Sequence, residues 1–160
     1  MAGKLRRELK KRGPFASLEQ EVFLSIARTA DQLLIRGERL MREQGLTGPQ
    51  YNVLRILRGE GKPLPMQEIA SRVVQVVPGI TGLVDRLEAA GLVHRERSTE
   101  DRRVIYVNIT PAGLDMLAKL DAPLLALEKK LLGGLTQADQ RQLIELLEKV
   151  RDHLEALDSP

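Results

Sequence analysis

Two short apolar segments, joined through a Val-Pro pair, limit what this chain can fold into more than any other feature. The pattern predicts one helix over Met66–Val74 and a second over Pro78–Ala90. Val77 precedes a proline, so its backbone is pushed away from the α region and the first helix must end before it. Pro78 fits the first position of the second helix, and Gly91 stops that helix. Helices this short and this closely joined must cross steeply, as in a helix-turn-helix.

The flanking sequence predicts longer helices and one hairpin around this unit. Capping patterns at Ser17–Gln20, Thr47–Gln50 and Thr136–Asp139 each predict a helix start. The expected helices span about 17–44, 47–59, 110–132 and 136–157. Two β-prone runs, 92–97 and 103–109, are joined by the polar residues 98–102 and predict a hairpin. The predicted fold class is mainly α: a winged helix-turn-helix with a small β-hairpin wing and long helices at both ends.

Composition narrows the possible functions. Aromatic residues make up 2% of the 160 residues, so the core must be aliphatic. There is no cysteine, which excludes disulfides and thiol chemistry, and the two histidines, His94 and His153, are too few for a histidine-rich metal site. No Ser/His/Asp arrangement and no Gly-rich phosphate loop is present, so we expect neither an enzyme nor a bound cofactor or metal.

Charge and hydropathy indicate where the chain acts and how it assembles. No stretch approaches the roughly 20 apolar residues that cross a bilayer, and the N-terminus lacks a secretory pattern, so we expect a cytoplasmic protein without membrane contact. Residues 1–12 carry six basic side chains against one acidic, which is typical of a solvated terminus or of a phosphate-contacting or dimer-clasping arm. Apolar stripes on both terminal helices are more than one chain can enclose, so we expect a two-fold homodimer.

Four segments in a fixed order resemble the MarR family of repressors. They are LTGPQYNVLRIL (46–57), MQEIASRV (66–73), PGITGLVDRLEAAGLVHRE (78–96) and DRRVIYVNITPAG (101–113). The resemblance implies one MarR-like domain over 1–160, with a DNA-binding lobe at 46–110 and dimerisation helices at 14–45 and 111–160.

The same resemblance implies a function. It predicts a homodimeric, sequence-specific regulator of transcription, most simply a repressor, on double-stranded DNA with half-sites about one helical turn apart. It also implies a small aromatic or anionic effector held between the dimerisation helices and the lobe. Tyr51 is either part of such a pocket or a core residue.

The second helix of the helix-turn-helix offers a face for the major groove. Its apolar residues, Ile80, Leu83, Val84 and Leu87, share one side, and the other side carries Gly79, Thr81, Gly82, Asp85 and Arg86. Thr81 and Arg86 are the candidates for polar contacts in a groove about 12 Å wide. Members of the family commonly have hydroxyl or basic side chains where this chain has Val77, Gly79 and Gly82. Either these glycines pack closely against a neighbouring helix, or the backbone itself approaches the DNA.

The hairpin is the second candidate contact. Arg95, Arg97, Arg102 and Arg103 lie on it among Glu96, Glu100 and Asp101, a pattern that a charge-balanced, solvated loop would also show. The resemblance implies that a wing arginine enters the minor groove, where narrow A·T-rich DNA attracts it. We assign that role to Arg102 and a wing-shaping pair to Asp101 and Arg103, although the two arginines could exchange roles. We expect His94 to face solvent or phosphate.

A different class of function fits the same fold. The sparse polar face of the helix over 78–90 would also suit a winged-helix module that binds proteins, with weak or no specific DNA binding. The salt dependence of DNA affinity distinguishes a DNA-binding regulator from a protein-binding module, because phosphate-driven DNA binding falls steeply as salt is added.

Overall fold

The computed structural model describes residues 3–75 and 79–158, so the predicted break at Val77 and helix start at Pro78 lie outside the described residues. The chain divides into two compact units, Met1–Ala122 and Pro123–Pro160. The first contains, in chain order, α1 (Lys4–Glu8), α2 (Leu18–Glu43), α3 (Gly48–Glu60), β1 (Leu64–Pro65), α4 (Met66–Arg72), α5 (Ile80–Ala89), β2 (Val93–Arg97) and β3 (Ile105–Ile109). α6 (Pro111–Leu132) begins there and ends in the second unit, which also holds α7 (Gln137–Asp158).

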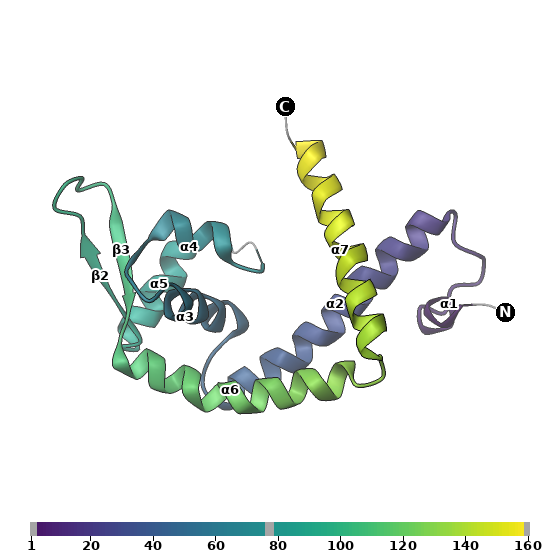
Figure 1. Ribbon diagram of the computed structural model, residues 1–160, viewed down its shortest axis with the longest axis horizontal. Helices are drawn as coiled ribbons and strands as arrows, with labels where there is room; N and C mark the ends of the chain where they lie inside the picture. The colour runs from purple at the N-terminus through teal and green to yellow at the C-terminus, as the bar shows by residue number, and fades with distance from the viewer. Residues whose placement is uncertain (1–2, 76–78, 159–160) are drawn as a thin grey trace. The chain divides into compact units, whose positions relative to one another are not determined.

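The predicted fold class, a winged helix-turn-helix with long terminal helices, is confirmed. Figure 1 shows α3, α4 and α5 gathered beside the β2–β3 hairpin. The predicted capping box at Thr47 is present: Thr47 Oγ1 accepts from the Gln50 N–H at 3.4 Å, and Gln50 Oε1 accepts from the Thr47 N–H at 2.9 Å. At the start of α2, Ser17 caps the Gln20 N–H, but Gln20 Oε1 accepts from the Ala16 N–H instead of that of Ser17.

The turn between α4 and α5 corrects one prediction. α4 ends at Arg72, with Val73 already extended, and α5 begins at Ile80. Gly79 is the N-cap of α5 in a left-handed conformation (φ +79°, ψ 51°), so it does not lie inside the helix as expected. A side chain would strain this conformation, and glycine adopts it readily. The need for a left-handed residue at the cap therefore explains Gly79.

The hairpin is confirmed, and it belongs to a three-stranded antiparallel sheet of order β1-β3-β2. Val93 pairs with Ile109 and Arg97 with Ile105, so β3 begins two residues later than predicted and Arg103 lies in the wing loop. The third strand, β1, was not predicted; Leu64 pairs with Val107 at the edge of the sheet. Pro65 is tolerated there because an edge strand needs no N–H on its outer side.

The core of the first unit is aliphatic, as the composition predicts. Its most deeply buried side chains come from α3, α4, α5, the sheet and the first half of α6: Val53, Leu54, Leu57, Ile69, Leu83, Val84, Leu87, Val93, Val107, Leu117 and Leu120. One cluster thus joins the helix-turn-helix to the base of the wing and to the start of α6.

The second unit contains an exposed amphipathic helix. Thr136 Oγ1 accepts from the Asp139 N–H and Asp139 Oδ2 from the Thr136 N–H, which confirms the predicted cap. The Thr136 hydroxyl and then its backbone N–H, both donating to Asp139 Oδ2, hold the pKa of Asp139 below its usual 3.8. No residue of α7 is buried. Its apolar side chains lie exposed along the helix: Leu143, Ile144, Leu146, Val150, Leu154 and Leu157.

Gly113 gives a test of how tightly α6 is seated on the sheet. A Cβ at this position would meet the Leu92 backbone carbonyl and would lie 2.7 Å from Ile109 Cγ1. We expect Gly113→Ala to lower the free energy of unfolding by about 1–3 kcal/mol through overpacking. Chemical denaturation measures this, and Gly59→Ala, where a Cβ meets nothing within 4 Å, is the control. The control should be neutral or stabilising, since alanine favours a helix by about 1 kcal/mol over glycine. Equal effects of the two substitutions would contradict this packing.

Candidate DNA-binding interface

The outer face of α5 is polar and open. Leu83, Val84 and Leu87 bury the inner face, while Thr81 and Arg86 are exposed on the other side. The Thr81 hydroxyl lies 3.6 Å from Met66 Sδ, which ties the first turn of α5 to the start of α4. Within the described chain the Arg86 guanidinium makes no hydrogen bond or ion pair, so its charge is available to a ligand.

The two glycines of this helix are not explained by close packing, so that alternative is wrong. A Cβ on Gly79 would meet nothing within 4 Å, and a Cβ on Gly82 would meet only Arg86 Nη1 at 3.8 Å. Among the described residues, no atom of a neighbouring helix lies within 4 Å of a Cβ at either position. For Gly82 the other alternative, close approach of the backbone to DNA, remains a prediction.

The wing loop is held in shape by its own hydrogen bonds. Ser98 Oγ accepts from the N–H groups of Glu100 and Asp101, each at 3.2 Å, and Asp101 Oδ1 accepts from the Arg103 N–H at 2.9 Å. The wing-shaping contact of Asp101 is therefore to the backbone of Arg103, and the expected ion pair with the Arg103 side chain is absent. The guanidinium groups of Arg102 and Arg103 stay without an ionic partner in the described parts of the chain.

Arg95 differs from the other wing arginines because its charge is neutralised inside the lobe. Its guanidinium lies 2.6 Å from Glu88 Oε2 and 2.5 Å from Asp85 Oδ1, and its backbone N–H donates to Glu88 Oε1 at 2.8 Å. The Arg95 guanidinium holds the pKa of Glu88 below its usual 4.5, and the hydrogen bonds to Glu88 raise the pKa of Arg95. These contacts join α5 to β2, so Arg95 is placed to set the angle between α5 and the wing.

The remaining residues that the sequence singled out lie on β2 of the wing and on α3. Arg97 is exposed at the end of β2, and no described residue pairs with it. The His94 ring is 44% exposed, with Nε2 3.1 Å from Glu96 Oε1. Tyr51 is half-buried on α3.

One hollow brings α5 and the wing together. It has a volume of about 500 Å³ and is lined by residues of α4, α5 and the wing loop, including Gln67, Thr81 and Arg103. Gln67 is exposed and was missed by the sequence reasoning, which named no residue of this helix as a candidate DNA contact. The signal available was a polar side chain in the first helix of a helix-turn-helix, the helix that crosses the DNA backbone in such motifs.

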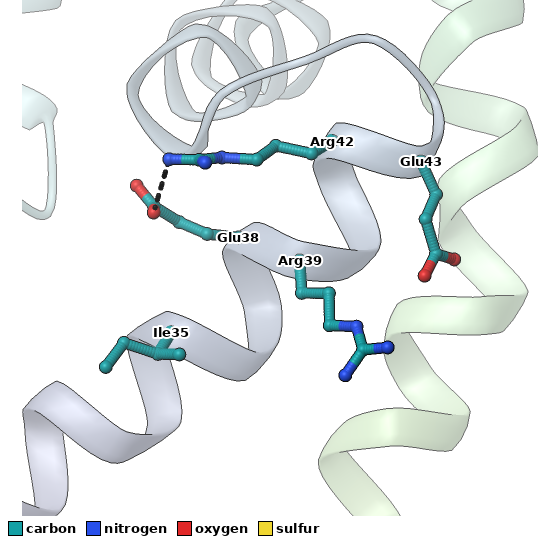
Figure 2. A pocket seen from close by; sticks show the side chains of 5 residues that line it. All are labelled: Ile35, Glu38, Arg39, Arg42 and Glu43. Carbon is teal, nitrogen blue, oxygen red and sulfur yellow. Dashed lines mark hydrogen bonds and ion pairs between the residues drawn. The ribbon is translucent and has the colours of Figure 1, made fainter.

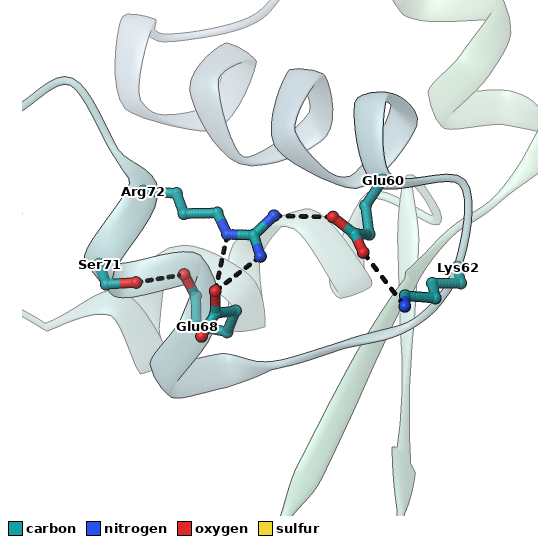
Figure 3. Close-up of polar contacts among 5 residues, drawn as sticks. All are labelled: Glu60, Lys62, Glu68, Ser71 and Arg72. Atoms are coloured by element: carbon teal, nitrogen blue, oxygen red, sulfur yellow. Dashed lines mark hydrogen bonds and ion pairs between the residues drawn. The ribbon is translucent and has the colours of Figure 1, made fainter.

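A network of ion pairs positions α4 and was also missed. Figure 3 shows Arg72 between Glu60 and Glu68, with N–O distances of 2.7 and 2.6 Å, and Lys62 on the other oxygen of Glu60 at 3.3 Å. Arg72 is the main reason that the pKa of Glu60 lies below its usual 4.5. The i,i+4 spacing of Glu68 and Arg72 could have indicated one pair, whereas the contact to α3 could not be read from the sequence.

A second hollow lies along the last turns of α2. It has a volume of about 610 Å³ and is lined by Ile35, Glu38, Arg39, Arg42 and Glu43 (Figure 2). Arg42 pairs with Glu38 at 3.4 Å, whereas Arg39 has no ionic partner among the residues that the structure describes. Across residues 3–75 and 79–158 there is no group of His, Asp or Glu side chains that could hold a metal ion. No helix in those ranges is long and apolar enough to cross a membrane.

A helix-turn-helix whose outer helix face stands beside an arginine-bearing wing defines a winged helix-turn-helix of the DNA-binding class. Comparisons agree with this class. The model of the MarR family matches residues 44–104. The HTH-type transcriptional repressor IacR of Pseudomonas putida is 33% identical over 135 residues, which cover 84% of this chain and 80% of that protein.

Solved structures extend the likeness over most of the chain. A MarR transcription factor from Planctomyces limnophilus is 38% identical, with a TM-score of 0.65, covering 84% of this chain and 98% of that one. The organohalide-sensing RdhR-CbdbA1625 transcriptional regulator, solved with 2,4-dichlorophenol bound, is 18% identical with a TM-score of 0.82, over 92% of this chain and 90% of its own. The chain belongs to the MarR family of transcriptional regulators.

The pair of Glu88 with Arg95 gives a pH-dependent test. We expect the Glu88 carboxyl to titrate below 4.5, and its midpoint to rise toward 4.5 in Arg95→Ala, because the variant removes the guanidinium that stabilises the carboxylate. Because the folded pKa is the lower one, the stabilisation is complete above about 4.5 and is lost as the pH falls through the folded pKa.

Carboxyl chemical shifts followed through an acid titration measure this midpoint. Arg97→Ala, on the same strand, is the control and should leave Glu88 unchanged. A Glu88 midpoint that does not move in Arg95→Ala would mean that the pair does not form in solution.

Proposed function

We propose that the protein acts as a homodimer that places α5 of each protomer in the major groove of a pseudo-palindromic operator. The observation that carries this proposal is the outer face of α5, where Thr81 and Arg86 are exposed beside a wing loop whose arginines have no partner within the described chain. Thr81 and Arg86 would contact base edges or phosphates, and the backbone at Gly79 and Gly82 would approach the DNA closely.

The wing would provide the second set of contacts. Arg102 enters the minor groove in this proposal, because it is exposed in the loop that Asp101 and Ser98 hold in shape. Arg97 and Arg103 would bind the flanking phosphates. Arg95 acts differently: Asp85 and Glu88 hold its guanidinium, so it positions the wing and does not contact DNA itself.

The terminal helices would form the dimer. Several large apolar side chains of α2 and α7 are exposed in the single chain, among them Leu18 (73%), Phe23 (71%) and Leu157 (66%). Exposed apolar surface on this scale marks an association site, and a two-fold partner is the commonest solution. The predicted division, with dimerisation helices at 14–45 and 111–160 around a DNA-binding lobe at 46–110, is part of this proposal.

Effector control would act by favouring one arrangement of the two lobes over another. We infer a small aromatic or anionic effector, because the hollow on α2 combines the apolar Ile35 with the unpaired charge of Arg39. The 2,4-dichlorophenol of the RdhR-CbdbA1625 structure is a ligand of that type. A repressor in the cytoplasm that leaves its operator when such a compound binds is the simplest regulator of this kind. Repeating DNA titrations with phenolic acids tests this.

Substitution of the two central arginines tests the DNA contacts. We expect Arg86→Ala and Arg102→Ala each to weaken operator binding by about 1–3 kcal/mol, because each removes a charged contact to the DNA. Operator fragments are first selected from random DNA with the wild-type protein, and affinities are then measured by gel-shift titration. Arg55→Ala, an exposed arginine on α3, is the control and should bind as the wild type does. Wild-type affinity of both variants would refute the placement.

The dimer is tested on the apolar stripe of α7. We expect Leu154→Asp to convert the dimer into monomers, since it places a charge among side chains that the partner would bury. Sedimentation equilibrium measures the mass. Asp152→Asn, on the same turn, should leave the dimer intact. A wild-type protein that sediments as a monomer at micromolar concentration would contradict the dimer.

Salt dependence separates this function from a protein-binding module. Operator affinity should fall steeply as salt rises, because binding releases counterions from the phosphates. A protein-binding module would give no sequence-specific DNA complex at moderate salt.

A further inference from the structure

Met66 lies where α4 meets the first turn of α5. It is the first residue of α4 and directly follows the strand β1, whose Leu64 pairs with Val107. Ile69, about one turn later in α4, is fully buried in the core. Strand pairing before Met66 and burial after it therefore fix the backbone from which this side chain projects.

The Met66 thioether contacts the candidate DNA-binding surface. Its sulfur lies 3.6 Å from Thr81 Oγ1, so the Thr81 hydroxyl donates to a weak acceptor. Within the described parts of the chain this is the one side-chain hydrogen bond of Thr81, and the N-cap of α5, Gly79, has no side chain to add another. Because the thioether holds the hydroxyl only weakly, Thr81 can exchange it for a base edge or a phosphate.

An oxidant can reach this methionine. Met66 is half-buried and lines the hollow of about 500 Å³ between α4, α5 and the wing loop. The chain has no cysteine, so methionine thioethers supply all of its sulfur. Oxidation of methionine to the sulfoxide is reversible by reductases, and it turns a flexible apolar side chain into a polar one.

We propose that Met66 is an oxidation site whose sulfoxide lowers operator affinity by holding the Thr81 hydroxyl away from DNA. The oxidant is a hydroperoxide. A sulfur lone pair attacks one oxygen of hydrogen peroxide, an S–O bond forms and the O–O bond breaks. The proton of the attacked oxygen passes to the other oxygen, which leaves as water, so that sulfur loses two electrons and the peroxide gains them.

The effect on DNA binding follows from the change of acceptor. A sulfoxide oxygen accepts a hydrogen bond more strongly than a thioether, so the Thr81 hydroxyl would donate to Met66 and no longer to DNA. This step rests on the proposed function, in which Thr81 contacts the operator.

Two other methionines of the described chain provide matched controls. Met41 on α2 and Met116 on α6 are half-buried as Met66 is, but they lie on elements without a candidate DNA contact. Sulfoxides at these two positions should therefore leave operator affinity unchanged.

The test is a gel-shift titration of the full-length protein on its selected operator, before and after hydrogen peroxide, with peptide mass mapping to locate each sulfoxide. We expect oxidation to weaken wild-type binding by about three- to tenfold, because one hydrogen bond to DNA is lost. Met66→Leu, which nearly keeps the volume without the sulfur, should have the same affinity before and after peroxide. Met41→Leu and Met116→Leu should respond as the wild type does, and methionine sulfoxide reductase should restore the wild-type affinity.

Thr81→Val separates this mechanism from a general loosening of α5. Without the hydroxyl the sulfoxide has nothing to hold back, so peroxide should weaken the binding of this variant by about twofold or less. Three results would overturn the proposal: a loss of affinity under peroxide in Met66→Leu, an equal loss in Thr81→Val and the wild type, or a circular dichroism spectrum that shows unfolding on oxidation of Met66.

A measurement without DNA distinguishes this proposal from the proposed function. The methyl resonance of Thr81 should shift when the wild type is oxidised and should stay in place in Met66→Leu, whether or not an operator is present. An unmoved resonance in the oxidised wild type would rule out the sulfoxide contact. An untreated wild type that forms no sequence-specific DNA complex would instead refute the proposed function.

Discussion

Packing of Leu83, Val84 and Leu87 against α3 and the sheet holds α5 in place, and the candidate DNA-binding surface depends on this contact. The three side chains are at most 2% exposed, and they meet a cluster that includes Leu54 and Val107. Because the cluster is made of leucine, valine and isoleucine, it fixes the helix by shape alone. Within the described chain the Arg86 guanidinium on the outer face of α5 is then free to meet a ligand, whereas Asp85 on the same helix is held by Arg95.

A second set of contacts between elements comes from arginines whose charges are paired with carboxylates. Arg95 joins α5 to the wing, Arg72 joins α4 to α3, and Arg58 joins α3 to α6. Each of these ion pairs links two elements that the aliphatic core already brings close. Because exposed ion pairs add little to the free energy of unfolding, their main effect is on the angle between the two elements. Four exposed arginines of α5 and the wing, Arg86, Arg97, Arg102 and Arg103, have no ionic partner in the described chain. On these two elements the arginines thus divide into Arg95, whose charge is paired with Asp85 and Glu88, and those that would remain available for phosphate.

Local signals in the sequence predict the elements well, and long-range contacts account for what they miss. The caps at Thr47 and Thr136 and the hairpin follow from patterns within a few residues, and the structure has them. β1 could not be predicted, because a two-residue strand containing a proline has no pattern of its own and exists only through its pairing with β3. Arg95 was grouped with the DNA contacts because its charge is visible in the sequence, whereas its partners Asp85 and Glu88 become visible only when α5 packs on β2.

The structural role of the glycines of α5 also could not be read from the sequence, and it affects how DNA would be recognised. With Gly79 fixed at the cap and Gly82 carrying no side chain, the exposed face of α5 can offer few hydrogen bonds to base edges beyond those of Thr81 and Arg86. In the proposed function, specificity would therefore have to come from other contacts as well. Insertion of a wing arginine would read the width of the minor groove. Such insertion depends on the placement of the wing against α5, which the ion pairs of Arg95 with Asp85 and Glu88 hold. The shape of the DNA would thus replace part of the base contacts that α5 cannot make.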